Sequence, residues 1–172
     1  ALPISDGRWI VGASADGTAQ LWEVVTGKVV PLAGHKGQVP FAAFSPSGEL
    51  VITTGLDRSV LVWESKSGRL KSRIVGHPGP ILMAHFSKDG QRLLTFSSDM
   101  SARLWEVSTG QQLLHIQGHR GPIYAAALSP DGTRLATVGW EGTVRQWSIR
   151  DGAPMSIFGA DGNGLGLSLG GQ

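Results

Sequence analysis

Histidine, hydroxyl and acidic residues recur together in this chain, and these residue types can support nucleophilic catalysis. Three Gly-His pairs, at Gly34-His35, Gly76-His77 and Gly118-His119, lie 42 residues apart. A histidine with a threonine and a carboxylate is the residue set of a hydrolase triad. A nucleophile site is unique in its chain, whereas this set recurs once per repeat and includes a tryptophan. We therefore interpret the set as structural and expect no enzyme activity.

Two further histidines and a glycine-rich tail are possible ligand sites by residue type alone. His85 lies in an apolar run and His115 in an outer-strand segment, and neither has a partner at metal-ligand spacing. The glycines of residues 159–172 have no strand-to-helix context for a phosphate-binding loop. We expect no metal and no cofactor.

The elements that position these residues follow from four tryptophans. Trp22, Trp63, Trp105 and Trp147 are separated by 41, 42 and 42 residues. A period of this length is typical of one four-stranded propeller blade per repeat. A glycine lies five residues after each of these tryptophans. Each repeat also has two predicted turns before its tryptophan, and in every copy the acid of the second turn lies ten residues after the turn-forming residue of the first. No helical period competes, so the predicted fold class is all-β.

The second repeat illustrates the expected strands. An apolar run covers residues 39–44, a turn follows at 45–48, and the β-branched run 50–54 is typical of a strand buried on both faces. Residues 60–63 form the next predicted strand. The more polar residues 69–75 form an outer edge strand.

Composition limits the function classes. The 172 residues are 41% hydrophobic and 16% charged, which indicates a packed core rather than disorder. The absence of cysteine excludes disulfides and thiolate metal sites. A net charge of +2 with scattered basic residues argues against a nucleic-acid partner, and no apolar run is long enough for a membrane span. We expect a cytoplasmic protein.

The Gly-His pairs, the strand pattern and the Trp-Glu or Trp-Ser repeat ends resemble the WD40-repeat family over nearly the whole chain. In that family a His, a Ser or Thr, an Asp and the Trp of one blade form a buried hydrogen-bonded network. Such a network satisfies its own buried polar groups. The matching positions are His35, Thr53, Asp57 and Trp63; His77, Thr95, Asp99 and Trp105; and His119, Thr137, Glu141 and Trp147.

The first repeat matches this network only in part. It has Asp16 and Trp22, but Gly12 stands where the threonine should be, and its Gly-His pair is missing. We expect this blade to be the weakest.

The resemblance also implies where partners bind. The family's binding face is lined by residues just after the Gly-His pair and just before the second-turn acid. The candidate partner-binding residues are therefore Gln38, Leu56, Leu82, Ser98, Tyr124 and Trp140. Tyr124 and Trp140 stand out because exposed aromatic side chains on a loop face are typical interface anchors. The alternative for Trp140 is that it covers its own blade or a neighbour.

The predicted blades cover residues 1–33, 34–75, 76–117 and 118–159, as one propeller segment. Residues 160–172 are predicted to be a degenerate inner strand or the start of the next blade. Because rings of this family usually have more blades, most often seven, we expect a segment of a larger ring. Two alternatives stay open: two copies joining into an eight-bladed ring, or an open arc whose exposed edges invite association.

The predicted function is a non-catalytic scaffold that binds a protein or peptide through the loop face. The alternative is a regulatory or sensory propeller portion of a larger signalling enzyme, a kinase or an ATPase, whose catalytic part lies outside this chain.

Overall fold

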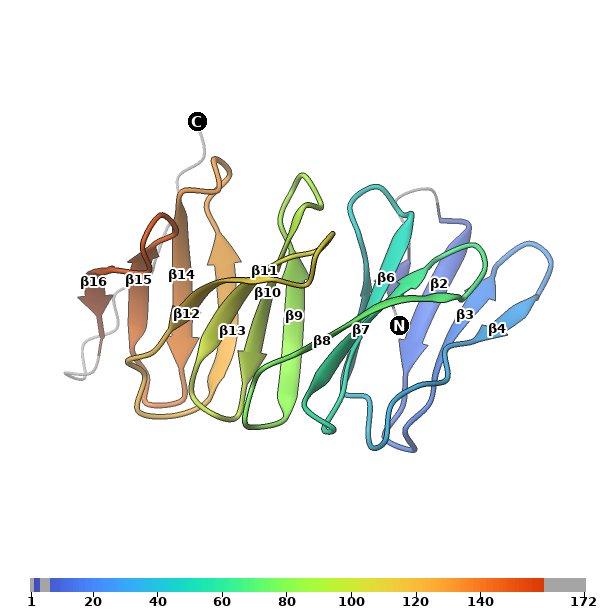
Figure 1. Ribbon diagram of the computed structural model, residues 1–172, viewed down its shortest axis with the longest axis horizontal. Coiled ribbons are helices and arrows are strands. Elements are labelled where there is room, and N and C mark those ends of the chain that lie inside the picture. Colours follow the sequence, from blue (N-terminus) through green and yellow to red (C-terminus); the bar gives the residue numbers. More distant parts are fainter. Residues whose placement is uncertain (1, 4–6, 160–172) are drawn as a thin grey trace.

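The computed structural model describes residues 2–3 and 7–159, and every regular element in that part is a β-strand (Figure 1). The first sheet contains β1 (Leu2–Pro3), β2 (Trp9–Ala13), β3 (Ala19–Glu23) and β4 (Val29–Pro31). The second contains β5 (Phe41–Phe44), β6 (Leu50–Thr54), β7 (Ser59–Glu64) and β8 (Leu70–Val75). The third contains β9 (Ile81–Phe86), β10 (Arg92–Ser97), β11 (Ala102–Glu106) and β12 (Gln112–Ile116). The fourth contains β13 (Ile123–Leu128), β14 (Arg134–Gly139), β15 (Val144–Ser148) and β16 (Pro154–Phe158).

Each sheet is an antiparallel meander in which strands adjacent in sequence pair with one another. The all-β fold and the four-stranded repeat unit predicted from the tryptophan period are thereby confirmed. Residues 160–172, predicted to be a degenerate inner strand or the start of the next blade, lie outside the described residues.

One predicted strand begins later than its apolar run. Val39 and Pro40 precede β5, which begins at Phe41. Pro40 has no N–H to give to a ladder. The Val39 N–H instead donates to the Ser14 carbonyl over 3.1 Å, which ties the second sheet to the first.

The apolar cores lie between neighbouring sheets. Val11, Leu21 and Leu32 of the first sheet pack against Val51 and Trp63 of the second. A second cluster joins the second and third sheets, and a third cluster joins the third and fourth. Each sheet is therefore stabilised mainly by burial against its neighbours.

The four sheets follow one another in a row, with the first and the fourth at opposite ends of the molecule (Figure 1). Within the described residues the ring is therefore open. Among residues 7–159, no sheet lies against the face of the fourth sheet that points away from the third. Phe158 is 40% exposed there, whereas its counterparts Leu32, Ile74 and Ile116 are each 1% exposed.

The strands of each sheet end at two opposite ends of the molecule, which we call the loop end and the turn end. The loop end carries the inter-sheet loops with the Gly-His pairs and the turns between the second and third strands of each sheet. The turn end lies at the other ends of the same strands. It carries the turns between the first and second strands, such as residues 87–91 and 129–133.

Candidate functional site

A chain of hydrogen bonds runs from the loop end into the second sheet. Trp63 Nε1 donates to Thr53 Oγ1 over 2.9 Å, and His35 Nε2 lies 2.8 Å from the same oxygen. His35 Nδ1 lies 3.1 Å from Asp57 Oδ1. Because a carboxylate only accepts, Nδ1 donates to Asp57, and Nε2 accepts from the Thr53 hydroxyl. Each of these four side chains thus has a partner of the correct kind.

The acid of this network stays ionised despite its partial burial. Burial by itself raises the pKa of Asp57, but hydrogen bonds from the Lys36 N–H, the Ser59 hydroxyl and His35 outweigh it and lower the pKa to about 2. The Arg73 guanidinium adds an ion pair at 3.3 Å. An ionised carboxylate with several donors is the stable arrangement for a half-buried acid.

The third sheet repeats the network with slightly shorter distances. Trp105 Nε1 donates to Thr95 Oγ1 over 2.8 Å, His77 Nε2 lies 2.7 Å from that oxygen, and His77 Nδ1 lies 2.8 Å from Asp99 Oδ2. The Ser101 hydroxyl donates to Asp99 over 2.6 Å. Burial lowers the pKa of His77, so the imidazole is neutral in the folded protein.

The fourth sheet holds the same arrangement with a glutamate in place of the aspartate. Trp147 Nε1 donates to Thr137 Oγ1 over 2.7 Å, and His119 bridges Thr137, at 2.7 Å, and Glu141, at 2.5 Å. Burial raises the pKa of Glu141, but hydrogen bonds from Thr143 and His119 bring it to about 2. The extra methylene of Glu141 thus still reaches the histidine.

The threonine hydroxyls of these networks cannot act as nucleophiles on an external substrate. Thr53, Thr95 and Thr137 are all fully buried, and each accepts a hydrogen bond from a tryptophan. A nucleophile must lie within reach of a bound substrate. The geometry therefore assigns the repeated His–Thr–acid set to internal hydrogen bonding.

The glycine of each Gly-His pair allows the histidine loop to lie against the blade tryptophan. A Cβ at Gly76 would lie 2.7 Å from Trp105 Cη2, and a Cβ at Gly118 would lie 2.9 Å from Trp147 Cη2. Real Cβ atoms do not approach this closely. Glycine is needed here because of a close approach.

The first sheet lacks the network. Asp16 is exposed and accepts from Thr18, and the structure does not join it to Trp22. The indole of Trp22 lies over Gly12, where a Cβ would be 2.5 Å from Trp22 Cζ3. A hollow of about 250 Å³ beside them is lined by Gly12, Ser14 and Gln20 among others. Trp22 is half-buried, whereas the other three repeat tryptophans are buried.

The candidate partner-binding residues lie at the loop end, and backbone hydrogen bonds hold their two segments together. The Leu56 N–H donates to the Gln38 carbonyl over 2.9 Å. The Ser98 N–H donates to the Pro80 carbonyl over 3.1 Å, and the Trp140 N–H to the Pro122 carbonyl over 3.0 Å. The second, third and fourth sheets therefore each present one fixed patch made of an inter-sheet loop and a turn. We call these patches together the loop face.

Exposure differs among the six candidates. Trp140 is 76% exposed, and Tyr124, two residues after Pro122, is 51% exposed. Gln38, Leu56 and Ser98 are exposed, and Leu82 is half-buried. The two aromatic side chains therefore offer the largest accessible apolar surface of the set. The alternative that Trp140 covers its own blade does not fit this exposure.

Sequence reasoning missed two residues of the loop face. Arg58 and Met100 adopt left-handed backbone conformations, with φ of 66° and 67°, at the turn position where other repeats have Gly17 and Gly142. A side chain in this region costs energy that glycine avoids. Both side chains are exposed. The available signal was a non-glycine residue where two other repeats carry glycine.

The loop face is positively charged at its surface. Lys36, Arg58 and Arg120 are exposed, and none of them forms an ion pair with a carboxylate of the described residues. In the second, third and fourth sheets the acids of the face are bonded to the histidines, and the exposed acid Asp16 lies in the first sheet. The accessible charge of the second, third and fourth patches is therefore mainly cationic.

Metal-ligand clusters and membrane-spanning helices are both absent from residues 2–3 and 7–159. No group of three or more His, Asp or Glu side chains in these residues is placed to hold a metal ion. No helix in that part of the chain is long and apolar enough to cross a membrane.

Comparison with known families agrees with this geometry. The family described as WD domain, G-beta repeat, matches residues 3–23, 27–64, 68–106 and 110–148. The chain belongs to the WD40-repeat family. The resemblance seen in the sequence is thereby confirmed.

Individual WD40 relatives match over part of the chain. An uncharacterised WD repeat-containing protein of Synechocystis sp. is 40% identical over 68 residues, which are 38% of this chain and 19% of the relative. A component of chromatin assembly factor 1 from Gallus gallus is 37% identical over 67 residues, 38% of this chain and 12% of the relative. Ribosome assembly protein 4 of Chaetomium thermophilum is 35% identical over 63 residues, 35% of this chain and 12% of the relative. Each match spans less than a fifth of the relative's length.

Proposed function

We propose that this WD40 chain is a non-catalytic scaffold that binds a protein or peptide through the loop face. The observation that carries the proposal is the 76% exposure of Trp140 on a turn whose backbone is fixed to Pro122. The tryptophans of the second, third and fourth repeat positions are 2–3% exposed, so this side chain serves no comparable packing role. Exposed tryptophan and tyrosine on a rigid surface are typical binding anchors.

Two further observations support a protein partner. Lys36, Arg58 and Arg120 favour a partner segment that carries acidic side chains near an apolar one. Two relatives are named for assembly processes, one for chromatin assembly and one for ribosome assembly. No feature of the described residues specifically favours the alternative of a regulatory portion of a kinase or ATPase.

The test is a pull-down followed by titration with the purified partner. Trp140→Ala with Tyr124→Ala should abolish binding and leave the circular dichroism spectrum and melting temperature unchanged, because both side chains are exposed. Leu70→Ala, an exposed apolar residue on an outer strand, is the matched control and should bind normally. Full affinity of the double variant would mean that the partner uses another surface.

Self-association is a second proposal, and the uncovered end face of the fourth sheet favours it. Phe158 occupies a position that a neighbouring sheet covers in the other three repeats. A second copy that offered its first sheet, with Ile10 and Trp22 half-buried, would supply such a neighbour. Light scattering of the purified chain over a range of concentrations tests this. A dimer that Phe158→Ser dissociates supports the proposal, and a monomer at all concentrations contradicts it.

A further inference from the structure

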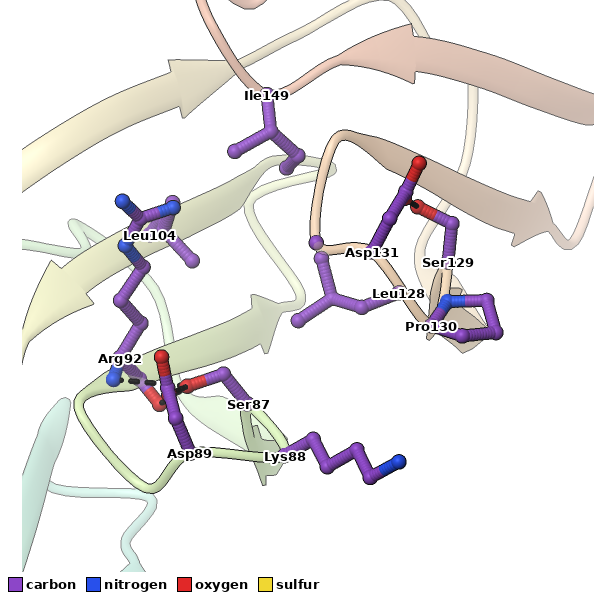
Figure 2. A pocket seen from close by; sticks show the side chains of 11 residues that line it. Ser87, Lys88, Asp89, Arg92, Leu104, Leu128, Ser129, Pro130, Asp131 and Ile149 are labelled. Atoms are coloured by element: carbon purple, nitrogen blue, oxygen red, sulfur yellow. Dashed lines mark hydrogen bonds between the residues drawn. The ribbon is translucent and has the colours of Figure 1, made fainter.

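A groove opens at the turn end between the third and fourth sheets. Its central hollow, of about 400 Å³, lies between the turns at residues 87–91 and 129–132 (Figure 2). Leu104 and Ile149 form its floor and are almost fully buried, whereas Leu128 is half-buried. Lys88 and Arg92 are exposed at its rim. Figure 2 shows these side chains coming from both sheets.

At the first and second junctions, a pair of large apolar residues closes the turn end. At the third junction different residues occupy these two positions, and the groove opens there. Each pair has one member from each of the two sheets at a junction. The first member is the second-strand residue that pairs with the glutamate directly after the blade tryptophan. The second member is the last residue of the first strand in the following sheet. The three pairs are Trp9 with Phe44, Leu50 with Phe86, and Arg92 with Leu128. The first two pairs pack in the apolar cores of their junctions. The third has an exposed cation and a smaller side chain, so the junction stays open at this end.

Two adjoining hollows lengthen the groove. One of about 470 Å³ shares Ser87, Lys88 and Leu128 with the central hollow and reaches Ala127 of the innermost strand β13. The other, of about 420 Å³, shares Arg92 and reaches Leu113 of the outermost strand β12. The groove therefore crosses the junction from the inner to the outer strands. This elongated, open shape suits an extended chain better than a compact small molecule.

Three cations and two ionised acids line the groove, which gives it a formal net charge of +1. Lys88, Arg92 and Arg150 line it, and none of them forms an ion pair with a carboxylate in the described part of the chain. Asp89 Oδ1 accepts from the Ser87 hydroxyl and the Gln91 N–H. Asp131 Oδ1 likewise accepts from the Ser129 hydroxyl and the Thr133 N–H. Both acids are exposed and keep their charge, but each has Oδ1 engaged within its own turn, whereas the three exposed cations have no carboxylate partner among the described residues.

We propose that this groove binds an extended peptide segment of a partner protein that carries large apolar side chains next to carboxylates. An apolar side chain would contact Leu114 and Leu128 on the walls, which are both half-buried, above the floor of Leu104 and Ile149. Carboxylates beside it would pair with Arg92 and Lys88 at the rim. The site lies at the end of the strands opposite the loop face, so one chain can hold two partner segments at once.

The test is fluorescence anisotropy with two labelled probe peptides. One contains alternating leucine and glutamate between glycine-serine flanks, and the other has lysine in place of each glutamate. The glutamate peptide should bind roughly tenfold or more tightly than the lysine peptide. Equal affinity for both, or no binding of the glutamate peptide, would overturn the proposal.

Variants of the chain test whether the peptide binds in the groove. Arg92→Leu with Leu128→Phe restores the closing pair of the second junction and should weaken binding roughly tenfold or more. Arg92→Glu keeps the hollow but reverses its charge, and should reverse the preference between the two peptides. Arg134→Leu is the matched control, because Arg134 takes the position of Arg92 in the fourth sheet and lies outside the groove. It should leave affinity within about twofold.

The loop face is tested in the same titration. Trp140→Ala should leave binding of the glutamate peptide unchanged. Loss of binding in Trp140→Ala, with binding retained in the Arg92→Leu and Leu128→Phe double variant, would place the peptide on the loop face and overturn the groove proposal.

Discussion

Thr53 and Thr54 are neighbours in β6 and are both fully buried, but only one of their hydroxyls has a hydrogen-bond partner. Thr53 Oγ1 accepts from Trp63 and bonds with His35. Thr54 points to the other face of the sheet, and its Oγ1 has no partner. Thr53→Val should cost about 1–3 kcal/mol, because it leaves the tryptophan N–H unpaired in a buried site.

The adjacent residue is the matched control. Thr54→Val should be neutral or raise the free energy of unfolding, because it removes an unpaired buried hydroxyl. Urea unfolding of both variants provides the measurement. Equal losses would mean that the Thr53 hydrogen bonds contribute no net stability.

Asp99→Ala should lower the melting temperature, since it leaves His77 Nδ1 and the Ser101 hydroxyl without their acceptor. Glu49→Ala is the suitable control, because the Glu49 side chain is exposed and forms no ion pair with a described residue. Glu23 would be a poor control, because it is buried and bonds with Arg8 and Thr26. Calorimetry that gave equal melting temperatures for the two alanine variants would contradict the network's contribution.

His85 gives a pH-dependent prediction. It lies between Phe41 and Phe96, and burial lowers its pKa from 6.5. The folded protein therefore holds His85 neutral while the unfolded chain takes up a proton below pH 6.5, so stability is lost as the pH falls through that value. His77 acts in the same direction.

Replacing His85 by leucine should remove its share of this loss. The free energy of unfolding of the variant, minus that of the unsubstituted chain, should be larger at pH 5 than at pH 8. The increase should be at most about 1.4 kcal/mol for each pH unit below 6.5. Urea unfolding at both pH values measures the difference. An identical difference between the two proteins at both pH values would show that His85 titrates alike in the folded and unfolded states.

Arg58→Gly and Met100→Gly should each raise the free energy of unfolding by up to about 1–2 kcal/mol, because both residues have positive φ. If their side chains contact the partner, the same variants should bind it more weakly. Thermal melts and titration with the partner measure the two effects. Ser98→Gly is the control for a side-chain loss on the same face at ordinary φ. A loss of stability in Arg58→Gly would mean that its side chain has a packing role.

The repeat architecture was predictable because it depends on local spacing. The interval between Trp63 and Trp105 equals the length of one four-stranded sheet with its connections. The β-branched run at residues 50–54 coincides with β6. The WD40 resemblance also indicated which side chains to consider for the loop face. Whether Tyr124 and Trp140 bind a partner stays a prediction.

The remaining features depend on contacts between segments that sequence spacing does not report. The position of the Trp22 indole over Gly12 is possible only because residue 12 has no side chain. The groove depends on what Arg92 and Leu128 face across a junction, and neither residue is unusual in its own strand. The strain at Arg58 is visible only in its backbone angles.

Because each apolar core lies between two sheets, energetic coupling in this chain passes only from one sheet to the next, as in a one-dimensional array. A substitution at one junction reaches distant sheets only through the intervening ones. Under mechanical load or partial denaturation the array should come apart at its weakest junction. The weak points are the first sheet, which lacks the His–Thr–acid network, and the third junction, which the groove opens, so a terminal sheet should be released first, as a single cooperative unit.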